Sequence, residues 1–262
     1  MVKTARKTAL LIALCFGANI VYASDSNDTN KSQSGFGGSI GFGVMNRAKY
    51  EGSKSYGAQA LPVLMLNYKI FFISPLGGIG FNLPISKKLI VAPALSFRPK
   101  RPKWREEDEG AIKGFKSLGA TAGANVIYKA NDFTFSARVF SGFSNNKGVS
   151  TDMSVAYAKK INDNWGLNFA LSAAYADKNY NQIYYGVTQE YSQKFGFDIY
   201  EAKAGFRDIG FGVNINYNIT KSLSIGVLSG YRRLIDVAAD SPIVKAGTPD
   251  QYIIGALFAY RF

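Results

Sequence analysis

The residue types that could carry out catalysis are restricted in this chain of 262 residues. The sequence contains no histidine and one cysteine, Cys15, which lies near the N-terminus. Without histidine, serine–histidine triads, cysteine–histidine pairs and histidine-ligated zinc or iron sites are all excluded. We therefore expect no metal site and no cofactor.

Carboxylates are the remaining candidates for acid–base chemistry, and four of them follow one another in Glu106-Glu107-Asp108-Glu109. Two carboxylates act as acid and base only where the fold fixes their separation, and a run of acids on a loop is usually a solvated surface. A serine activated by lysine would be another route to hydrolysis, but no spacing in the sequence supports it. We predict that the protein is not an enzyme.

A basic cluster that includes a tryptophan directly precedes these acids. Arginine matches the geometry of phosphate, so one hypothesis is that the cluster contacts lipopolysaccharide phosphates or another anionic surface component. Opposite charges this close also pair with each other and keep a loop soluble, and we favour this simpler interpretation. The cluster consists of Arg98, Lys100, Arg101, Lys103 and Arg105.

The first 23 residues have the pattern of an export signal. Three basic residues precede a short apolar run at 9–18, and Val21-Tyr22-Ala23 follows with small residues where a signal peptidase reads them. We predict a signal peptide over residues 1–23, a short periplasmic N-terminal arm over 24–34 and one domain over 35–262. Cleavage would leave a mature chain without cysteine, so that no disulfide could stabilise it.

The basic excess of the chain limits its partners. Its formal charge is +13, and removal of the three basic leader residues lowers this to +10. Nucleic acid is not an expected partner of an exported protein. Outer-membrane lipid, lipopolysaccharide and the carboxylates of murein are closer at hand and are sufficient to explain the excess.

An alternation with a period of two residues is the strongest structural pattern. From 209 to 219 the odd positions are apolar and the even positions are glycine or asparagine; residues 164–175 repeat this, with Trp165 and Tyr175 at the ends of the apolar face. Such alternation is typical of strands, and aromatic residues at both ends match the interfacial girdles of a membrane barrel. No apolar stretch after residue 24 approaches the length of a membrane-spanning helix. We predict an all-β, transmembrane, antiparallel up-and-down β-barrel in the outer membrane.

The polar face and the ends of the chain support a closed barrel. A soluble barrel or sandwich also alternates, but its apolar face must fill a core with residues of varied size. Here the other face consists of glycine, alanine, serine and asparagine, which suits a narrow lumen. The segments 35–46 and 251–262 alternate equally well, and their pairing would leave no backbone unpaired in lipid.

Short turns and long polar loops alternate along the chain, as they do between the periplasmic and outer ends of a membrane barrel. Eight strands are predicted over 88–262, and three more alternating segments would make eleven, whereas bacterial single-chain barrels have even numbers. Dividing the run 70–83 at Ser74-Pro75-Leu76-Gly77-Gly78 gives twelve strands, because proline cannot donate to a ladder and glycine favours turns. Ten is the alternative. An unbroken apolar phase across this turn, and Pro93 inside a predicted strand, argue against twelve.

Several basic residues fall at predicted strand positions, mostly in the phase of the polar face. Pairing with acids such as Asp152 and Glu201 would fill the lumen, whereas the same residues could tune a narrow anion-preferring pore. We favour filling in a barrel of this size. The basic residues are Arg138, Lys203, Arg207, Arg232 and Arg261.

Seven segments in order along the chain form a recognisable set. They are Tyr50-Glu51-Gly52-Ser53, Leu61-Pro62, Lys113-Gly114-Phe115, Tyr184-Tyr185-Gly186-Val187-Thr188, Tyr200 with Ala204-Gly205, Leu234-Ile235-Asp236-Val237-Ala238-Ala239-Asp240-Ser241-Pro242-Ile243-Val244, and the terminal Tyr260-Arg261-Phe262. In these segments the chain resembles the MipA/OmpV family of outer-membrane proteins, also called MltA-interacting proteins.

The resemblance implies an outer-membrane barrel, with a terminal aromatic residue similar to the assembly signal that the barrel-insertion machinery reads. Some members of the family are implicated as scaffolds that join a lytic transglycosylase to a murein synthase, and others are described as porin-like or adhesive. Our leading hypothesis is a non-catalytic scaffold that binds such periplasmic murein enzymes through its turns and the 24–34 arm. The alternative is a narrow porin-like channel or a surface-binding barrel.

The motif residues that we single out lie on loops predicted to be outside the cell, whereas murein enzymes are periplasmic. Their simplest role is structural: glycine and proline shape tight loops, while aspartate and serine make local hydrogen bonds to the backbone. These residues are Tyr50, Gly52, Ser53, Tyr185, Gly186, Asp240, Ser241 and Pro242.

Overall fold

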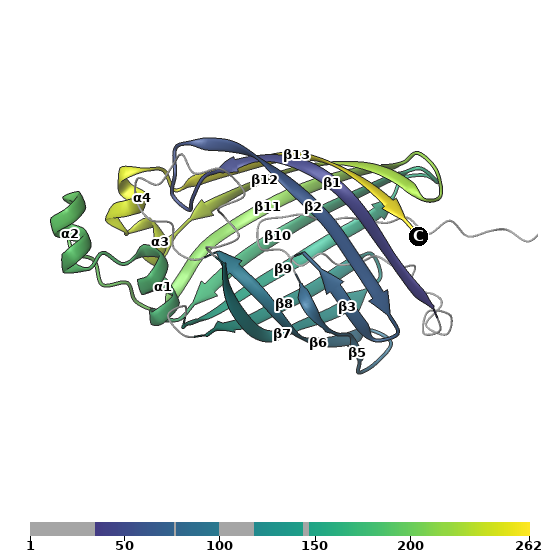
Figure 1. The fold of residues 1–262 in the computed structure, drawn as a ribbon, viewed down its shortest axis with the longest axis horizontal. Helices are drawn as coiled ribbons and strands as arrows, with labels where there is room; N and C mark the ends of the chain where they lie inside the picture. Colours follow the sequence, from purple (N-terminus) through teal and green to yellow (C-terminus); the bar gives the residue numbers. More distant parts are fainter. Residues whose placement is uncertain (1–34, 76, 100–117, 144–146) are drawn as a thin grey trace, which may run out of the picture.

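The computed structural model describes residues 35–262, except 76, 100–117 and 144–146. These residues form an antiparallel β-barrel with short helices at one end (Figure 1). The strands are β1 (Phe36–Ala48), β2 (Tyr56–Tyr68), β3 (Phe71–Ser74), β4 (Gly78–Phe81), β5 (Leu83–Pro84), β6 (Leu89–Pro99), β7 (Leu118–Ala130), β8 (Phe133–Gly142), β9 (Val149–Lys160), β10 (Trp165–Ala176), β11 (Gly205–Asn218), β12 (Leu223–Leu234) and β13 (Asp250–Arg261). The helices are α1 (Lys178–Tyr185), α2 (Gln189–Phe195), α3 (Asp236–Ala239) and α4 (Pro242–Ala246).

The first and last strands close the barrel. β1 pairs with β13 from Ser39 opposite Arg261 to Arg47 opposite Ile253. Gly38 and Phe262 extend this ladder, because each backbone N–H donates to the other's carbonyl oxygen, at 3.2 and 3.1 Å. Closure removes the free sheet edges that the two ends of the chain would otherwise expose to lipid. The predicted pairing of the two terminal segments is confirmed.

The predicted count of twelve strands is also confirmed over the described residues. β4 and β5 both pair with β6 and form a single interrupted strand. Ser74 pairs with Gly78 across the predicted turn, and Gly78 has a φ of +80°. A Cβ at Gly78 would lie 2.0 Å from the carbonyl oxygen of Leu95, so a residue without a side chain is required there.

The proline inside β6 fits at this interruption. The ladder between β4 and β6 ends at Gly80 opposite Ala94, and the ladder of β5 begins at Leu83 opposite Val91. Pro93 lies between these two stretches and has no N–H to donate. Pro93 is therefore compatible with strand β6, because the neighbouring strand is interrupted between β4 and β5 at this level.

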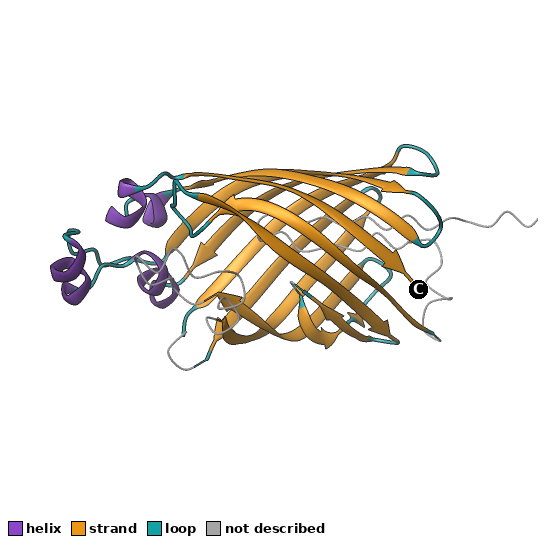
Figure 2. Cartoon of the chain, turned by 45° about the horizontal axis from the view of Figure 1, so that its top comes forward, coloured by secondary structure: helices purple, strands orange, loops and turns teal. Residues whose placement is uncertain are grey.

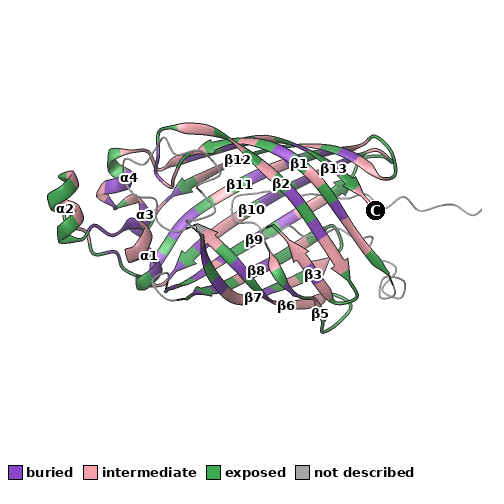
Figure 3. Cartoon of the chain, viewed as in Figure 1, coloured by how far each residue is buried: buried purple, intermediate pink, exposed green. Residues whose placement is uncertain are grey.

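Side chains alternate between the outer surface and the lumen, as predicted (Figure 3). On β10, Phe169 and Leu171 are exposed on the outside, whereas Asn168 and Ala170 are buried on the inside. Aromatic pairs mark both ends of the outer band. Trp165 packs on Tyr217 with ring centroids 4.8 Å apart at one end, and Tyr175 packs on Phe206 at 5.5 Å at the other.

The two ends of the barrel differ in their connections (Figure 2). All four helices lie at one end, and the described connections at the other end are tight turns, where the C-terminus also lies. None of the helices among the described residues is long and apolar enough to cross a membrane. Long loops outside and short turns in the periplasm place the helices at the extracellular end. The predicted signal peptide and the 24–34 arm lie outside the described residues and stay predictions.

Candidate functional site

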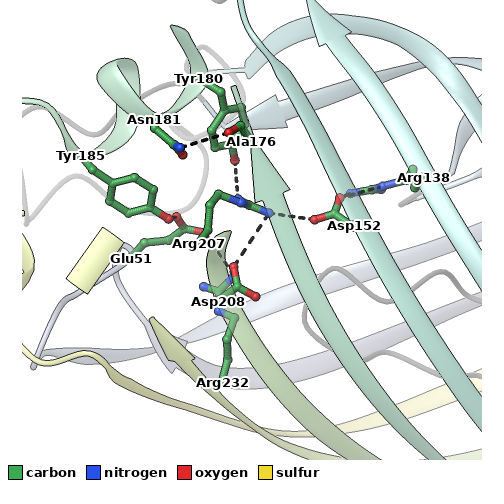
Figure 4. Close-up of polar contacts among 10 residues, drawn as sticks. All are labelled: Glu51, Arg138, Asp152, Ala176, Tyr180, Asn181, Tyr185, Arg207, Asp208 and Arg232. Atoms are coloured by element: carbon green, nitrogen blue, oxygen red, sulfur yellow. Dashed lines mark hydrogen bonds and ion pairs between the residues drawn. The ribbon is translucent and has the colours of Figure 1, made fainter. Parts of the chain in front are cut away.

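Charged side chains gather inside the barrel beneath the extracellular loops (Figure 4). They project from β1, β6, β8, β9, β11 and β12 on the face otherwise occupied by small residues, and the β1–β2 loop and α1 add further members. We call this set the mouth cluster. It consists of Arg47, Glu51, Arg98, Arg138, Asp152, Tyr180, Tyr185, Arg207, Asp208 and Arg232.

Asp152 on β9 bridges two arginines. Its Oδ2 accepts from Nε and Nη2 of Arg138 at 3.2 and 3.0 Å, and its Oδ1 accepts from Nη2 of Arg207 at 2.8 Å. Charge-assisted bonds of this kind are stronger than neutral ones. The predicted pairing of lumen arginines with Asp152 is confirmed. Glu201 instead pairs with Lys178 on the exposed loops, so its predicted position in the lumen is wrong.

A β-bulge places two consecutive charged residues in the lumen. Ala174 of β10 pairs with Asp208, but the next residue, Tyr175, pairs with Phe206, so that Arg207 has no partner across the ladder. Both Arg207 and Asp208 are therefore buried, at 4% and 3% exposure, although neighbours on a regular strand face opposite sides. Strict alternation would have turned Arg207 outward, in phase with Ile209.

The sequence does contain a trace of this bulge. The outward apolar residues of β11 repeat every two positions from Ile209 onward, but Phe206 precedes Ile209 by three. The extra residue in that interval is the signal that sequence reasoning missed. Lys203, which we expected within this strand, lies just before its start at Gly205 and is exposed.

Asp208 and Glu51 connect the bulge to the first extracellular loop. Oδ2 of Asp208 lies 3.9 Å from Nη2 of Arg207 and 3.8 Å from Nη1 of Arg232. The same Nη1 of Arg232 lies 3.2 Å from Oε1 of Glu51. The other carboxylate oxygen of Glu51 accepts a hydrogen bond from the Tyr185 hydroxyl. Alternating charges thus join β11 and β12 to the first extracellular loop, and the Tyr185 hydroxyl adds α1 to this network.

Tyr180 on α1 lies between two guanidinium groups. Its hydroxyl accepts from Nη1 of Arg207 at 2.7 Å, and the guanidinium carbons of Arg207 and Arg98 each lie 4.8 Å from its ring centroid. Nη2 of Arg98 also donates to the carbonyl oxygen of Gly148 at 2.8 Å. Arg98, the first residue of the predicted surface-binding cluster, therefore contacts the mouth cluster. The other four, Lys100, Arg101, Lys103 and Arg105, lie outside the described residues, and contact with an anionic surface stays a prediction.

The family-motif loops pack against one another above the mouth cluster. Oγ of Ser241 donates to the carbonyl oxygen of Tyr185 at 2.6 Å and accepts from the N–H of Ile243 at 3.3 Å. Ser241 thus makes the predicted local hydrogen bond and also a hydrogen bond to Tyr185, which is 56 positions away in the sequence. Pro242 begins α4 directly after Ser241, while Asp240 is exposed and lies 3.7 Å from Lys245.

The first extracellular loop completes this packing. Gly52 has a φ of +93°, and a Cβ there would lie 2.9 Å from Cγ2 of Val244. The carbonyl oxygen of Gly52 accepts from the N–H of Thr248 at 2.9 Å, and the carbonyl oxygen of Tyr50 accepts from the N–H of Ser53 at 3.1 Å. Gly186 ends α1, where a Cβ would lie 2.3 Å from Nε2 of Gln182. The predicted structural role of the glycines is confirmed at both positions.

Burial and charge set the protonation of the loop residues in the cluster. Burial favours the neutral form of Glu51, but the charges of Arg232 and Arg207 and the Tyr185 hydroxyl outweigh it and lower the pKa of Glu51. Burial raises the pKa of Tyr185, and that of Tyr184 to about 12. At neutral pH Glu51 is therefore ionised, and Tyr184 and Tyr185 keep their hydroxyl hydrogens. In the part of the chain that the structure describes, no three cysteine or acidic residues are placed to hold a metal ion.

Comparison with known families decides which family this barrel represents. The model of the family described as "MltA-interacting protein MipA" matches residues 40–262. The chain belongs to the MipA family. Among curated relatives of this MipA-family barrel, "Putative outer membrane protein YiaT" of Escherichia coli (strain K12) is 23% identical over 228 residues, which cover 86% of this chain and 90% of that protein. The MipA-family barrel is an outer-membrane protein, as predicted.

Solved outer-membrane structures also resemble this MipA-family chain. A structure of the NanC porin covers 85% of the chain and is itself fully covered, with a TM-score of 0.48 and 7% sequence identity. For the outer membrane channel DcaP of Acinetobacter baumannii, the match covers 89% of this chain and 99% of the channel, with a TM-score of 0.38 and 10% sequence identity. Both similarities are remote.

Proposed function

We propose that the protein is a non-catalytic outer-membrane barrel that binds small anionic solutes at its extracellular mouth and passes them through a narrow lumen. The charge balance of the mouth cluster is the observation that carries this proposal. As defined above, the cluster contains five arginines and three acids. Arg47, the least buried of the five, donates from Nε to Gln59 at 2.8 Å and is close enough to Arg232 and Glu51 to interact electrostatically.

The donors suit carboxylate or phosphate ligands. Arginine presents planar pairs of N–H groups that match both anions, and the Tyr180 hydroxyl, which accepts from Arg207, still has a hydrogen to donate. Arg138, Arg207 and Arg232 are held in place by acids of the cluster, so the positions of these three arginines do not depend on a ligand. An entering anion would find a field that is positive overall and donors that are already oriented.

One wall of the lumen below the cluster is lined by small side chains, which supports passage. The inward face of β10, β11 and β12 includes Ala170, Ser172, Gly210, Gly212 and Gly226. Barrels of eight strands have interiors that side chains fill, and the diameter of a barrel grows with the number of strands. In a barrel of twelve strands, the small side chains on this wall favour a water-filled path along it.

Ion selectivity in planar bilayers tests this proposal. The purified barrel should give a steady conductance, and its reversal potential under a salt gradient should report a preference for anions. Arg232→Gln should reduce that preference. The matched control is Arg233→Gln, because Arg233 is the next residue on β12 but is exposed and pairs with Asp250 at 2.9 Å. No steady conductance, a preference for cations, or equal effects of the two variants would contradict the proposal.

The scaffold role is a second candidate, favoured by the family's description as MltA-interacting. In that role the barrel would bind a lytic transglycosylase and a murein synthase on the periplasmic side, where its connections are tight turns such as Asn162–Trp165. Co-purification from membranes at native abundance, with and without residues 24–34, tests it. Failure to recover either enzyme with the full-length barrel would argue against this role.

A further inference from the structure

The hydrogen-bonded wall of the barrel is incomplete on one side. β2 has thirteen residues, but its neighbour β3 has four and pairs only with Leu66, Asn67 and Tyr68. On the other side of the β3–β4 hairpin, β4 pairs with β6, and the pair nearest the helical end is Ile79 opposite Leu95. Within the described part of the chain, no strand pairs with residues 56–65 of β2 or 96–99 of β6 on this side (Figure 1).

The backbone groups that face this interruption follow from the ladder. Gly38 bonds to Phe262 of β13, so even residues of β1 face β13 and odd residues face β2. In the β1–β2 register, odd residues of β2 lie opposite odd residues of β1 and bond to them. The backbone N–H and C=O groups of the even residues of β2 therefore point away from β1. Pro62 is one of these and has no N–H. The other four, Tyr56, Ala58, Ala60 and Leu64, direct their N–H groups into the interruption.

The interruption lies at the level of the lipid hydrocarbon. Leu64, Pro62 and Ala60 of β2 pair with Ile40, Phe42 and Val44 of β1, which are exposed apolar residues of the outer band. Across the interruption, Leu95 and Phe97 of β6 are 62% and 65% exposed. Backbone groups at this depth are costly unless water or another polar partner reaches them. Because this interruption is nearer the helical end of the barrel, it faces the outer leaflet.

The inner surface beside the interruption is apolar, unlike the rest of the lumen. Val63 and Met65 of β2 are buried with Leu257 and Ala259, and Leu61 packs against them. On the other flank, a second apolar cluster combines residues of β3, β6 and β8. Its members are Phe72, Ala92, Ala94 and Phe140. The opposite wall carries buried asparagines instead, namely Asn168, Asn214 and Asn216.

We propose that the interruption is a lateral opening that admits the acyl chain of a single-chain anionic amphiphile from the outer leaflet. The acyl chain would lie between the β2 and β6 edges, next to Leu61, which is partly buried beside the first cluster, and to the exposed Leu95 and Phe97 of β6. The head group would reach the mouth cluster through Arg98, which follows Phe97 on the β6 edge but contacts Tyr180 inside. The head-group contact rests on the proposed anion-binding function, whereas the opening for the chain does not.

Fluorescence quenching by a spin-labelled fatty acid tests the opening. The barrel, with its leader removed, is placed in nanodiscs of phosphatidylcholine and labelled with a fluorophore at Leu61→Cys or at Leu228→Cys. Both positions face the lumen at similar depth, but Leu228 lies behind complete ladders with β11 and β13. Stearate with a nitroxide near its terminal methyl should quench the label at 61 at least twofold more than the label at 228. Gln59→Cys replaces Leu61→Cys if that variant does not fold.

The methyl ester of the same probe separates the two parts of the proposal. Stronger quenching at 61 by the acid than by the ester supports both the opening and the head-group contact. Equal quenching by acid and ester retains the opening and removes the head-group contact, as would an absence of anion selectivity in the conductance experiment. No preference for position 61 over position 228 with either probe would overturn the proposal.

Discussion

The hydroxyl of Tyr185 donates a hydrogen bond to the carboxylate of Glu51, a residue that precedes it by 134 positions. Glu51 in turn lies 3.2 Å from Arg232, so this bond connects α1 and the first extracellular loop to the wall of the barrel. The extracellular loops are therefore fixed to the lumen by side chains as well as by their own packing. This linkage leads to four predictions on stability, in addition to the ion-selectivity and quenching experiments above.

Tyr185→Phe removes the donor and keeps the ring. Because the lost bond is to a charged acceptor that is itself partly exposed, we expect the free energy of unfolding to fall by about 1–2 kcal/mol. Urea unfolding in detergent micelles measures this change. Tyr260→Phe, at a lipid-exposed tyrosine of β13, is the control and should change it by less than about 0.5 kcal/mol. Equal effects would show that the bond contributes little.

Loop closure should depend on pH through Glu51. The pKa of Glu51 in the folded protein is lower than in the unfolded chain, because the attraction of Arg232 and Arg207 outweighs the effect of burial. Its contribution to stability is complete above the ordinary value of about 4.3 and is lost as the pH falls through the lowered pKa. Limited proteolysis of the extracellular loops should accelerate over that acidic range. The Glu51→Gln variant should be cleaved readily at neutral pH and should lose this pH dependence. If its rate of loop proteolysis varied with pH as in the parent, Glu51 would not be the group responsible.

Asp152→Ala should be among the most damaging substitutions in the lumen. It leaves Arg138 and Arg207 without the carboxylate between them, and removal of one member of a buried ion pair costs about 3–5 kcal/mol. Asp163→Ala is the control, because Asp163 pairs with Lys160 on an exposed turn, where such pairs contribute about 0–1 kcal/mol. Thermal unfolding followed by the heat-dependent mobility of the barrel on gels measures both. A cost for Asp152→Ala within the range of the control would argue against the bridge.

Ser241→Ala tests the contact between the loop that carries α1 and α2 and the loop that carries α3 and α4. It removes the hydrogen bond to the carbonyl oxygen of Tyr185 and the cap of α4, and we expect a loss of about 1–2 kcal/mol. Asp240→Ala, at the exposed neighbouring residue, should stay within about 0.5 kcal/mol of the parent. Hydrogen exchange of the loop amides measures the change locally. Similar protection in both variants would show that this contact does not hold the loops.

Sequence patterns predicted the wall of the barrel well because they depend on local geometry. The pleat of a strand sends successive side chains to opposite faces, so the alternation around Phe169 or Val213 specifies which residues meet lipid. The division at Ser74–Gly78 was predictable for the same reason, since the turn depends on the residues within it. The bulge at Arg207 was missed, although the three-residue spacing between Phe206 and Ile209 is a sequence signal for it.

The sequence by itself determined that the chain forms twelve two-faced strands with long loops at one end and acid-paired arginines within. Only the tertiary structure decided that Glu51, Tyr185, Asp208 and Arg232 meet, and that the wall is interrupted beside β2. Side-chain direction along a strand is fixed by neighbouring residues, whereas the contacts of Glu51 with Tyr185 and Arg232 join segments more than a hundred positions apart. Their positions depend on the register with which the barrel closes, which no local pattern encodes.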